Sequence, residues 1–408
     1  MRSTLEAAII GGGPIGSYAA LNLAKLGVQV TVFEEHSEIG LPSHCAGHIS
    51  IRSLRSLGLY PLPNGIVENT FDTANFYSPT GIKFSLHLSQ QVTTTLDRAL
   101  FDKYLAEKAK SAGAQFVLNA RVQSLIKADG FVKGINVLRN TQKEEKVYSK
   151  ITLDAEGISS RLLKEAGLTA LNPKGLVYAV EVEVENVRDI ESKAVEVYFG
   201  KSYAPGFYGW LIPKNDGTAK VGLATNQGNP RKFLNVLMSK HPVASKQLGG
   251  AKITKIGYHA ITLGGPIERT YANGFLAVGD CASQVKPTTG GGVIFGLTCA
   301  KIAAQTVNEA LQKGDVSCDF LQIYQKRCSE VLHFDFSVML RLRRFLDSLP
   351  DEKLDEILRF CGKMGVDKAL RDVDEIDFQG KLMLQVLGKP AMLAAIAYFA
   401  ILYLSANP

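Results

Sequence analysis

The sequence has few of the features that mark several protein classes. Its six cysteines form no CxxC pair and no zinc-like spacing, and no secretory signal precedes them, so neither a disulfide scaffold nor a metal site is expected. No internal repeat is present, and the 38 glycines and 15 prolines are spread along the chain, which argues against disorder. These absences predict a globular protein of a reducing cytoplasm that binds no metal.

Long apolar runs and concentrated charge are also scarce. The most apolar stretch, Ala391 to Leu404, is shorter than the about 20 residues of a membrane-spanning helix. Two interpretations stay open for it: a terminal helix facing the core, or a helix lying in the membrane interface. The net charge of +7 is scattered, so nucleic acid is not expected as a partner, whereas weak attraction to phosphate groups or an anionic membrane is.

The length and composition favour more than one domain. With 408 residues, of which 46% are hydrophobic and 21% charged, the chain exceeds what one hydrophobic core usually supports. We therefore expect two interleaved domains.

The N-terminal region carries a dinucleotide-binding pattern. An apolar strand ending at Ile10 is followed by GxGxxG and a helix-periodic stretch, and a second strand, 28–33, then delivers two acids. In this pattern the glycines permit a tight turn, approach of a pyrophosphate and close packing of helix on strand, while an acid binds the ribose hydroxyls. We assign the ribose to Glu34, and the candidate residues here are Gly11, Gly13, Pro14, Ile15, Gly16, Glu34 and Glu35.

Later segments favour FAD over NAD. A helix over 96–113 carries Arg98 in its first turn, and three strands, 122–126, 131–138 and 147–153, lead to an acidic turn. A further strand, 274–278, ends in Gly-Asp, and glycines then open a long helix whose positive end would stabilise the charge of a reduced flavin. The candidate FAD contacts here are Arg98, Val122, Asp154, Gly157, Gly279, Asp280, Gly290, Gly291, Gly292 and Val293.

These segments resemble the ordered FAD motifs of the para-hydroxybenzoate hydroxylase-like fold. The motifs are GxGxxG at 11–16, LDRALFD at 96–102, DAEG at 154–157 and GDCASQVKPTTGGG at 279–292. Glu156 stands where that fold usually has Asp. The resemblance implies an α/β fold in which a Rossmann-type FAD-binding domain is interleaved with an α+β substrate domain built on a mainly antiparallel sheet, followed by C-terminal helices.

Two further segments resemble the geranylgeranyl reductase family. P-x-x-Y-x-W-x-I-P at 205–213 is similar to that family's PxxYxWxFP motif, with Ile212 in place of Phe. From the residues alone, a packed aromatic pair is the favoured interpretation of Tyr208 and Trp210; the resemblance implies instead that they line an apolar substrate tunnel. Ser43 to Gly47 resembles the family's flavin-facing cysteine-glycine loop, which adds Cys45, Ala46 and Gly47 as candidates, with Ala46 in place of Gly.

The resemblance implies an FAD-dependent oxidoreductase acting on CH-CH groups. Its substrate would be the geranylgeranyl chain of an archaeal-type ether-lipid precursor, with hydride from flavin N5 and Cys45, or a water that it holds, taking part in protonation. NAD(P)H docking transiently, or a ferredoxin-like protein, would supply electrons, since no second GxGxxG is present. The alternatives are an aromatic-ring monooxygenase and a non-enzymatic prenyl-binding protein on the same fold.

The motif positions also predict the domain boundaries. Three segments, 1–60, 96–170 and 271–315, are expected to form the FAD-binding domain. Residues 61–95 and 171–270 are expected to form the substrate domain, and 316–408 a helical segment with candidate helices at 335–345, 351–361 and 381–404. The expected location is the cytoplasm, with peripheral contact on the inner face of the membrane as an open alternative and the oligomeric state undetermined.

Overall fold

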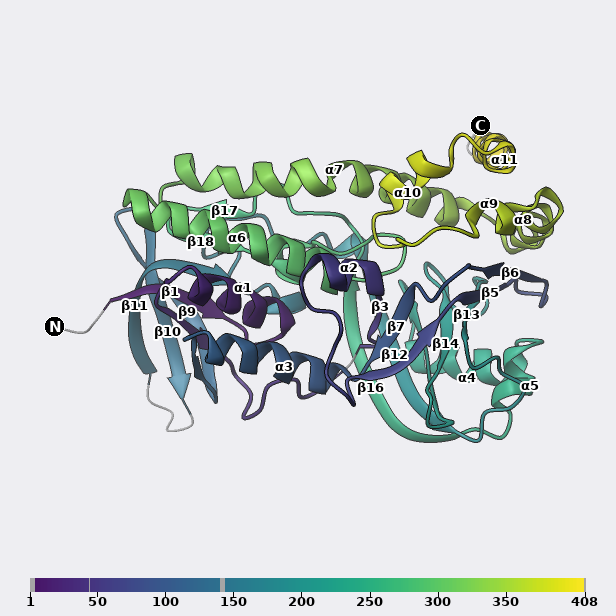
Figure 1. The fold of residues 1–408 in the computed structure, drawn as a ribbon, viewed down its shortest axis with the longest axis horizontal. Coiled ribbons are helices and arrows are strands. Elements are labelled where there is room, and N and C mark those ends of the chain that lie inside the picture. The colour runs from purple at the N-terminus through teal and green to yellow at the C-terminus, as the bar shows by residue number, and fades with distance from the viewer. Residues whose placement is uncertain (1–3, 44, 140–143, 407–408) are drawn as a thin grey trace. The chain divides into compact units, whose positions relative to one another are not determined.

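The computed structural model describes residues 4–43, 45–139 and 144–406. The chain divides into two units, each built from three separate segments. Unit 1 comprises Met1–Ser43, Arg98–Gly175 and Thr262–His333, and unit 2 comprises His44–Asp97, Leu176–Ile261 and Phe334–Pro408. The colours of Figure 1 show this interleaving, because segments distant in sequence lie within the same unit.

Unit 1 is an α/β unit built around a largely parallel sheet with the strand order β17-β18-β11-β1-β2-β8. β10 pairs antiparallel with β11, and β9 pairs antiparallel with β10. The strands of unit 1 are β1 Leu5–Ile10, β2 Val30–Phe33, β8 Gln115–Val117, β9 Ala120–Ala128, β10 Phe131–Arg139, β11 Glu144–Asp154, β17 Tyr271–Ala272 and β18 Phe275–Ala277. Its helices are α1 Pro14–Lys25, α3 Arg98–Ser111, α6 Val293–Lys313 and the first half of α7 Cys318–Ser348, with short 3-10 turns at Gly157–Ser159, Pro173–Gly175 and Gly279–Ala282.

The parallel strands of unit 1 end side by side. Ile10 pairs in register with Phe33 and with Asp154, and Asp154 pairs with Ala277. β1, β2 and β18 are short, mainly apolar runs that are largely buried on both faces, as parallel strands covered by other elements usually are. α1 packs against α3 and α6. The carboxyl ends of four strands therefore meet at one edge, which is where ligands bind in open α/β sheets.

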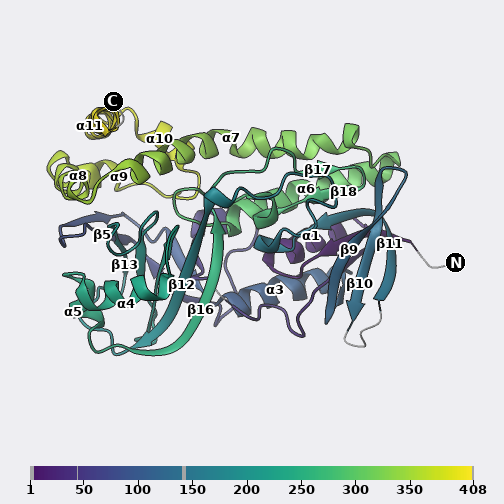
Figure 2. The ribbon, with the colours of Figure 1, turned by 180° about the vertical axis from the view of Figure 1, so that it is seen from behind.

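Unit 2 is built on a seven-stranded sheet with the order β16-β12-β15-β14-β13-β5-β6, antiparallel except where β13 meets β5. Figure 2 shows its long strands β12 and β16 side by side. The sheet strands are β5 Thr73–Tyr77, β6 Lys83–His87, β12 Leu176–Glu185, β13 Ala194–Tyr198, β14 Gly209–Pro213, β15 Ala219–Thr225 and β16 Lys252–Thr262. A small sheet adds β3 His48–Ser50, β7 Thr93–Leu96 and β4 Val67–Phe71.

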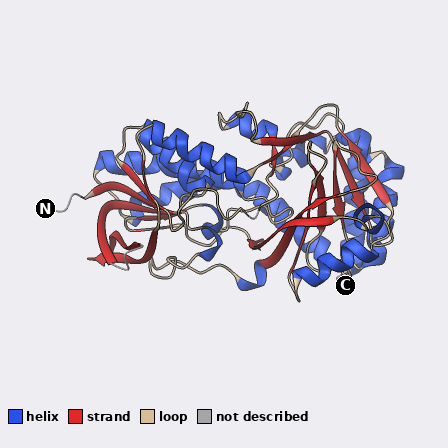
Figure 3. Ribbon diagram, turned by 90° about the horizontal axis from the view of Figure 1, so that it is seen from below, coloured by secondary structure: helices blue, strands red, loops and turns tan. Residues whose placement is uncertain are grey.

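The two faces of the large sheet in unit 2 have different compositions. Val182, Leu211 and Val221 point to one face and pack with Leu234 and Leu237 of α4 Pro230–Lys240. Because side chains alternate along a strand, the neighbouring residues of β12, β14 and β15 point to the opposite face. The other helices are α2 Ile51–Ser56, α5 Ala244–Leu248, α8 Asp351–Met364, α9 Val366–Leu370, α10 Gln379–Val386 and α11 Pro390–Ala406; Figure 3 distinguishes helices from strands throughout.

The C-terminal helices differ in detail from the sequence prediction. The helix expected at 335–345 is the end of α7, a longer helix that begins at Cys318. The helix expected at 381–404 is broken into α10 and α11, because Pro390 lacks the N–H that a continuing helix would need and instead begins α11. Among the described residues no single helix is long and apolar enough to cross a membrane, and α10 with α11, bent by 120°, meets that length and composition test only as a pair.

Candidate functional site

The turn between β1 and α1 is built from glycines that leave no room for side chains. Gly11 has φ of +94°, and a Cβ there would overlap the carbonyl of Ala155. A Cβ on Gly16 would overlap the carbonyl oxygen of Gly11, so α1 lies directly against the turn. The backbone geometry at these two positions matches what the sequence pattern requires of them.

Gly13 is placed differently from its neighbours. It precedes Pro14, the first residue of α1, and a Cβ at Gly13 would meet nothing within 4 Å. No side chain caps this end of α1, and its first turn has no acidic residue. The backbone N–H groups at the start of α1 are therefore available to an anion such as a pyrophosphate.

The two acids after β2 have different surroundings. Glu34 is 12% exposed, and its Oε2 accepts a hydrogen bond of 2.7 Å from the N–H of Gly12. Glu35 is 48% exposed and forms an ion pair with Arg121 at 3.4 Å. Only Glu34 therefore lies against the glycine turn, in the place expected of a ribose-binding acid.

Arg98 and Val122 lie in the same unit as the glycine turn. The Arg98 guanidinium is 11% exposed and donates to both carboxylate oxygens of Asp102, at 3.1 and 3.2 Å, one turn further along α3. A cation in the first turn of a helix is disfavoured by the helix dipole, and the ion pair with Asp102 offsets that cost for Arg98. Val122 is buried in β9, and its carbonyl accepts a hydrogen bond of 3.2 Å from Arg161.

The turn after β11 is held by its own acidic residues. Asp154 is fully buried, and its Oδ1 accepts a hydrogen bond of 3.0 Å from the N–H of Glu156. Burial raises the pKa of Asp154 well above its ordinary value, and the negative charge of Glu156 raises it further. Glu156, which replaces the usual Asp, accepts bonds from Ser159 Oγ at 3.0 Å and the Leu162 N–H at 2.8 Å. The longer side chain thus braces the turn, while Gly157, with φ of +70°, faces open space.

The second glycine-rich segment lies against the first. Ile15 of α1 packs on Gly279 and Gly296, since a Cβ on Gly279 would lie 3.2 Å from Ile15 Cγ1. A Cβ on Gly292 would come 2.7 Å from Asp280 Oδ1, so the strand tip and the start of α6 are also in contact. The motifs at 11–16 and 279–292, far apart in sequence, are thereby brought together.

The start of α6 is a second helix end without a side-chain cap. Gly292 precedes Val293, and no acidic residue lies in the first turn. Gly290 has φ of +70°, and a Cβ on Gly291 would lie 2.6 Å from Cε of Lys286. Lys286, which is 7% exposed, is a buried cation that the sequence analysis missed; its signal was a lysine inside an otherwise uncharged stretch of the motif.

Taken together, the glycine-lined edge of unit 1 fits an FAD molecule. It offers two uncapped helix N-termini, an acid against the first turn, and open backbone at Gly13 and Gly157. A dinucleotide needs this combination of anion-binding N–H groups, a ribose acceptor and close backbone approach. Among the described residues, no group of three or more His, Cys, Asp or Glu side chains could hold a metal ion.

In unit 2, the aromatic residues of the PxxYxWxIP segment form a contact row. Tyr208 stacks on Phe207 with ring centroids 4.3 Å apart and meets Trp210 edge-on at 6.1 Å. Burial raises the pKa of Tyr208, whose hydroxyl is therefore neutral at physiological pH. Trp210 and Ile212 pack with Phe71, Val195 and Ala46 in one apolar cluster.

Trp210 also takes part in a row of residues that crosses three strands. Gly222 of β15 pairs with Glu181 of β12 on one side and with Trp210 of β14 on the other. A Cβ on Gly222 would lie 2.6 Å from Trp210 Cε2, so the glycine leaves the space that the indole ring fills. Across that space the Trp210 Nε1–H donates to Glu181 Oε2 at 3.0 Å.

The loop that carries Cys45 lies in unit 2, near Trp210. Ala46 packs in the Trp210 cluster, and its carbonyl accepts a hydrogen bond of 3.2 Å from the Lys220 ammonium. Gly47 has φ of +71° and its N–H meets Cys45 Sγ at 3.4 Å, while Cys45 itself is exposed. His44, part of the same predicted loop, lies outside the described residues.

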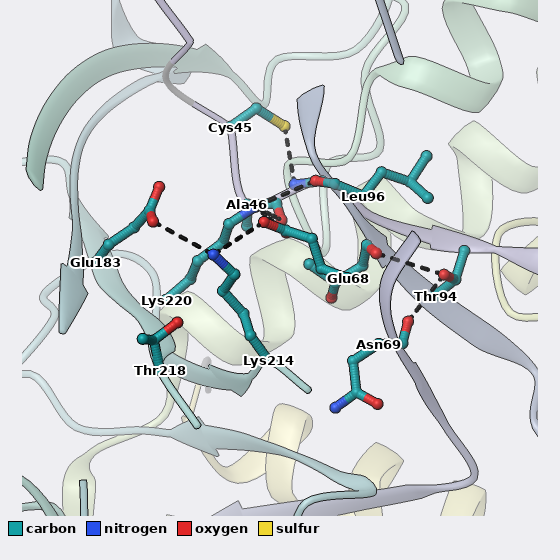
Figure 4. Close-up of polar contacts among 12 residues, drawn as sticks. Cys45, Ala46, Glu68, Asn69, Thr94, Leu96, Glu183, Lys214, Thr218 and Lys220 are labelled. Atoms are coloured by element: carbon teal, nitrogen blue, oxygen red, sulfur yellow. Dashed lines mark hydrogen bonds and ion pairs between the residues drawn. The ribbon is translucent and has the colours of Figure 1, made fainter. Parts of the chain in front are cut away.

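A network of charged residues, buried at Lys220 and half-buried elsewhere, lies beneath this loop (Figure 4). Lys220 is 4% exposed, pairs with Glu68 Oε2 at 2.6 Å and donates to the Leu96 carbonyl at 3.1 Å. Glu68 also pairs with Lys214 at 3.2 Å, and Lys214 with Glu183 at 3.5 Å. The sequence analysis missed these residues; alternating charges in EVEVE at 181–185 and the lysine inside an apolar strand at 219–225 were the available signals.

The fold and the glycine-lined strand ends define a flavoprotein with a Rossmann-type FAD-binding unit. The family model of the FAD binding domain matches residues 4–333. A digeranylgeranylglycerophospholipid reductase of Methanothermobacter thermautotrophicus is 35% identical, covering 87% of this chain and 91% of its own. Another, from Methanosarcina acetivorans, is 33% identical, covering 88% of each chain. This chain belongs to the digeranylgeranylglycerophospholipid reductase family.

Solved structures agree with this assignment. A geranylgeranyl bacteriochlorophyll reductase-like protein from Thermoplasma acidophilum superposes with a TM-score of 0.85 at 26% identity, covering 97% of this chain and 96% of its own. A flavin-dependent brominase superposes with a TM-score of 0.68 at 19% identity, covering 88% and 93%, and shows the shared fold alone. The predicted fold class, with FAD as cofactor, is confirmed.

Proposed function

We propose that this protein is an FAD-dependent reductase that saturates isolated double bonds in the geranylgeranyl chains of archaeal-type membrane ether-lipid precursors. The similarity to digeranylgeranylglycerophospholipid reductases over nearly the whole chain carries the proposal. FAD, when bound and reduced, supplies the hydride for this chemistry. The remaining tasks belong to the protein: binding the cofactor, placing an apolar chain and holding a proton.

The residues of unit 1 are proposed to hold the cofactor. The N–H groups at the start of α1 bind the pyrophosphate beside Gly13, and Glu34 binds the ribose. Arg98, with Asp102 fixing its orientation, supplies a positive charge. The remaining proposed contacts are Gly11, Pro14, Ile15, Gly16, Glu35, Val122, Asp154, Gly157, Gly279, Asp280, Gly290, Gly291, Gly292 and Val293.

The residues of unit 2 are proposed to receive the lipid. Tyr208 and Trp210 present a continuous aromatic surface to an apolar chain, and the loop of Cys45, Ala46 and Gly47 lies against the Trp210 cluster. Contact with isoprene units removes apolar surface from water without requiring polar partners. These three aromatic and cysteine side chains, Tyr208, Trp210 and Cys45, are the proposed substrate contacts.

The purified protein tests the proposal directly. We expect a yellow protein whose flavin bleaches with dithionite and reoxidises, without oxygen, when a geranylgeranyl ether lipid is added, with the product mass rising by two hydrogens for each bond removed. A colourless protein that takes up no FAD would contradict the proposal and leave a non-enzymatic prenyl-binding protein as the alternative. Oxygen incorporated into an aromatic compound would identify a monooxygenase.

The electron donor is proposed to be NAD(P)H, docking transiently, or a ferredoxin-like protein. Anaerobic mixing of the oxidised protein with NADH, NADPH and a reduced ferredoxin, each alone, distinguishes them by the rate of flavin bleaching.

The C-terminal helices are proposed to contact the membrane that contains the substrate, on its inner face. Ala395 and Leu402 of α11 are buried in the unit 2 core, whereas Leu393 and Ile401 are 52% and 64% exposed, as is Leu384 of α10 at 57%. One side of α11 thus packs on the protein and another remains apolar and exposed, which suits a helix lying at a membrane surface.

A further inference from the structure

The carboxyl group of Glu181 lies on the same side of the unit 2 sheet as Trp210. It is partly buried and stands in the row that contains Gly222 and Trp210. Within the described part of the chain, its only hydrogen bond comes from the indole N–H of Trp210, to Oε2. An indole N–H can only donate, so Oε2 is kept as an acceptor and a proton on this carboxyl group must sit on Oε1.

Reducing a carbon–carbon double bond needs a proton as well as a hydride. The hydride forms a C–H bond at one alkene carbon, and the electron pair of the double bond forms the second C–H bond, at the other carbon, with a proton from an acid held nearby. An exposed thiol such as Cys45 has water in competition for that role. A carboxylic acid fixed beside the aromatic surface combines a donor with a defined position.

We infer that Glu181 is the proton donor of the reduction, with Trp210 fixing its orientation. The inference rests on the proposed function. The Oε1–H bond breaks, a C–H bond forms at the alkene carbon that did not receive the hydride, and the electron pair of the O–H bond stays on the carboxylate. The Trp210 N–H and the Lys220 ammonium stabilise that carboxylate until solvent reprotonates it.

The charges around Glu181 suit such a donor. Burial, partly offset by the Lys220 charge and the Trp210 hydrogen bond, raises the pKa of Glu181 to about 7, and the charges of Glu183 and Glu68 act in the same direction as burial. An acid with a pKa near the working pH both gives up and regains its proton readily. The charge of Lys220, from β15, acts on Glu181, so the carboxylate formed in the reaction has a counter-charge.

The sole tryptophan makes this proton observable without turnover. Trp210 is the only Trp in the sequence, and its N–H contacts Glu181 directly. Tryptophan fluorescence of the purified flavoprotein should therefore titrate with a midpoint near the pKa of about 7. In Glu181→Gln the titration should disappear. In Glu183→Gln, two residues along the same strand, it should persist with a slightly lower midpoint, because one neighbouring negative charge is lost.

Turnover provides the second measurement. Since the acid must be protonated to donate, the rate of flavin reoxidation by lipid should fall as pH rises through about 7 in the wild type. Glu181→Gln should bind FAD and bleach normally, lose this pH dependence and react about 100-fold more slowly or worse, and Glu181→Asp should recover part of the rate. Glu183→Gln and Cys45→Ser should keep the pH dependence.

Two outcomes overturn the inference. One is a Glu181→Gln protein that reoxidises with the wild-type rate and pH profile. The other is a reoxidation rate that loses its pH dependence in Cys45→Ser but not in Glu181→Gln, which would assign the proton to the thiol. If the wild type itself fails to reoxidise with any geranylgeranyl lipid, the proposed function fails instead. The fluorescence titration separates the cases, because it reports the protonation of Glu181 whether or not lipid is reduced.

Discussion

At the scale of single residues, the glycines of the first turn have separable roles. Gly16 and Gly11 are packed against backbone, whereas Gly13 has space beside it and an ordinary φ of −62°. The same substitution should therefore have different effects at Gly13 and Gly16.

We expect Gly13→Ala to fold normally and to bind FAD on the order of tenfold more weakly, a loss of about 1.4 kcal/mol, because its methyl group occupies the approach path of the pyrophosphate. Gly16→Ala should instead lower the free energy of unfolding by about 3 kcal/mol, the upper end of overpacking effects. Flavin titration and denaturant unfolding of the flavin-free proteins measure the two quantities. An unchanged FAD affinity in Gly13→Ala would remove that residue from the cofactor site.

The local geometry of the FAD motifs could be predicted from the sequence, because it depends on neighbouring residues alone: a positive φ, a missing Cβ or an acid at a strand end. Glu156 shows where such prediction stops. Its substitution for Asp was visible in the sequence, but whether the longer side chain reaches the ligand or bends back to Ser159 and Leu162 depends on the path of the following turn.

At the scale of elements, β15 carries a buried cation inside an apolar strand. Lys220 is surrounded by Glu68 and two backbone carbonyls. Its role was not predictable, since the partners come from three separate parts of the sequence. A charge within a strand is usually interpreted as a solvent-facing residue.

Lys220→Met should destabilise unit 2 by about 3–5 kcal/mol. The substitution removes one of the two lysines that pair with Glu68 and leaves only Lys214 beside that largely buried carboxylate. Lys255→Met is the matched control: Lys255 is 56% exposed and pairs with Glu183 at the surface, so the expected loss is below about 1 kcal/mol. Thermal unfolding of both variants measures the difference. Equal, small losses would mean that water reaches the Lys220 site.

At the scale of the whole molecule, the sequence left two interpretations of the C-terminal apolar run open, a helix packed on the core and a helix in the membrane interface. The apolar run was too uniform to reveal which side would be buried, because nearly every position of 391–404 is apolar. Packing on unit 2 selects one side of α11, and Leu393 and Ile401 remain exposed.

The double variant Leu393→Ser, Ile401→Ser should partition at least about tenfold more weakly onto anionic lipid vesicles, since burying each such side chain is worth about 1.5–3 kcal/mol. Ile256→Ser, which removes an exposed side chain of β16 instead, should partition like the wild type. Vesicle sedimentation with unchanged flavin content measures the effect. Equal partitioning of all three proteins would exclude α11 as the contact.

The alternation of the two units along the chain constrains how the protein can be made and divided. The sheet begun by residues 5–10 gains its last strands only at 271–277, and unit 2 is completed only by the C-terminal helices. Neither unit can therefore finish folding during synthesis until its last segment, which ends at residue 333 or 408, has been translated. For the same reason any uninterrupted fragment that contains one unit in full, whether expressed or released by limited proteolysis, also carries two segments of the other unit.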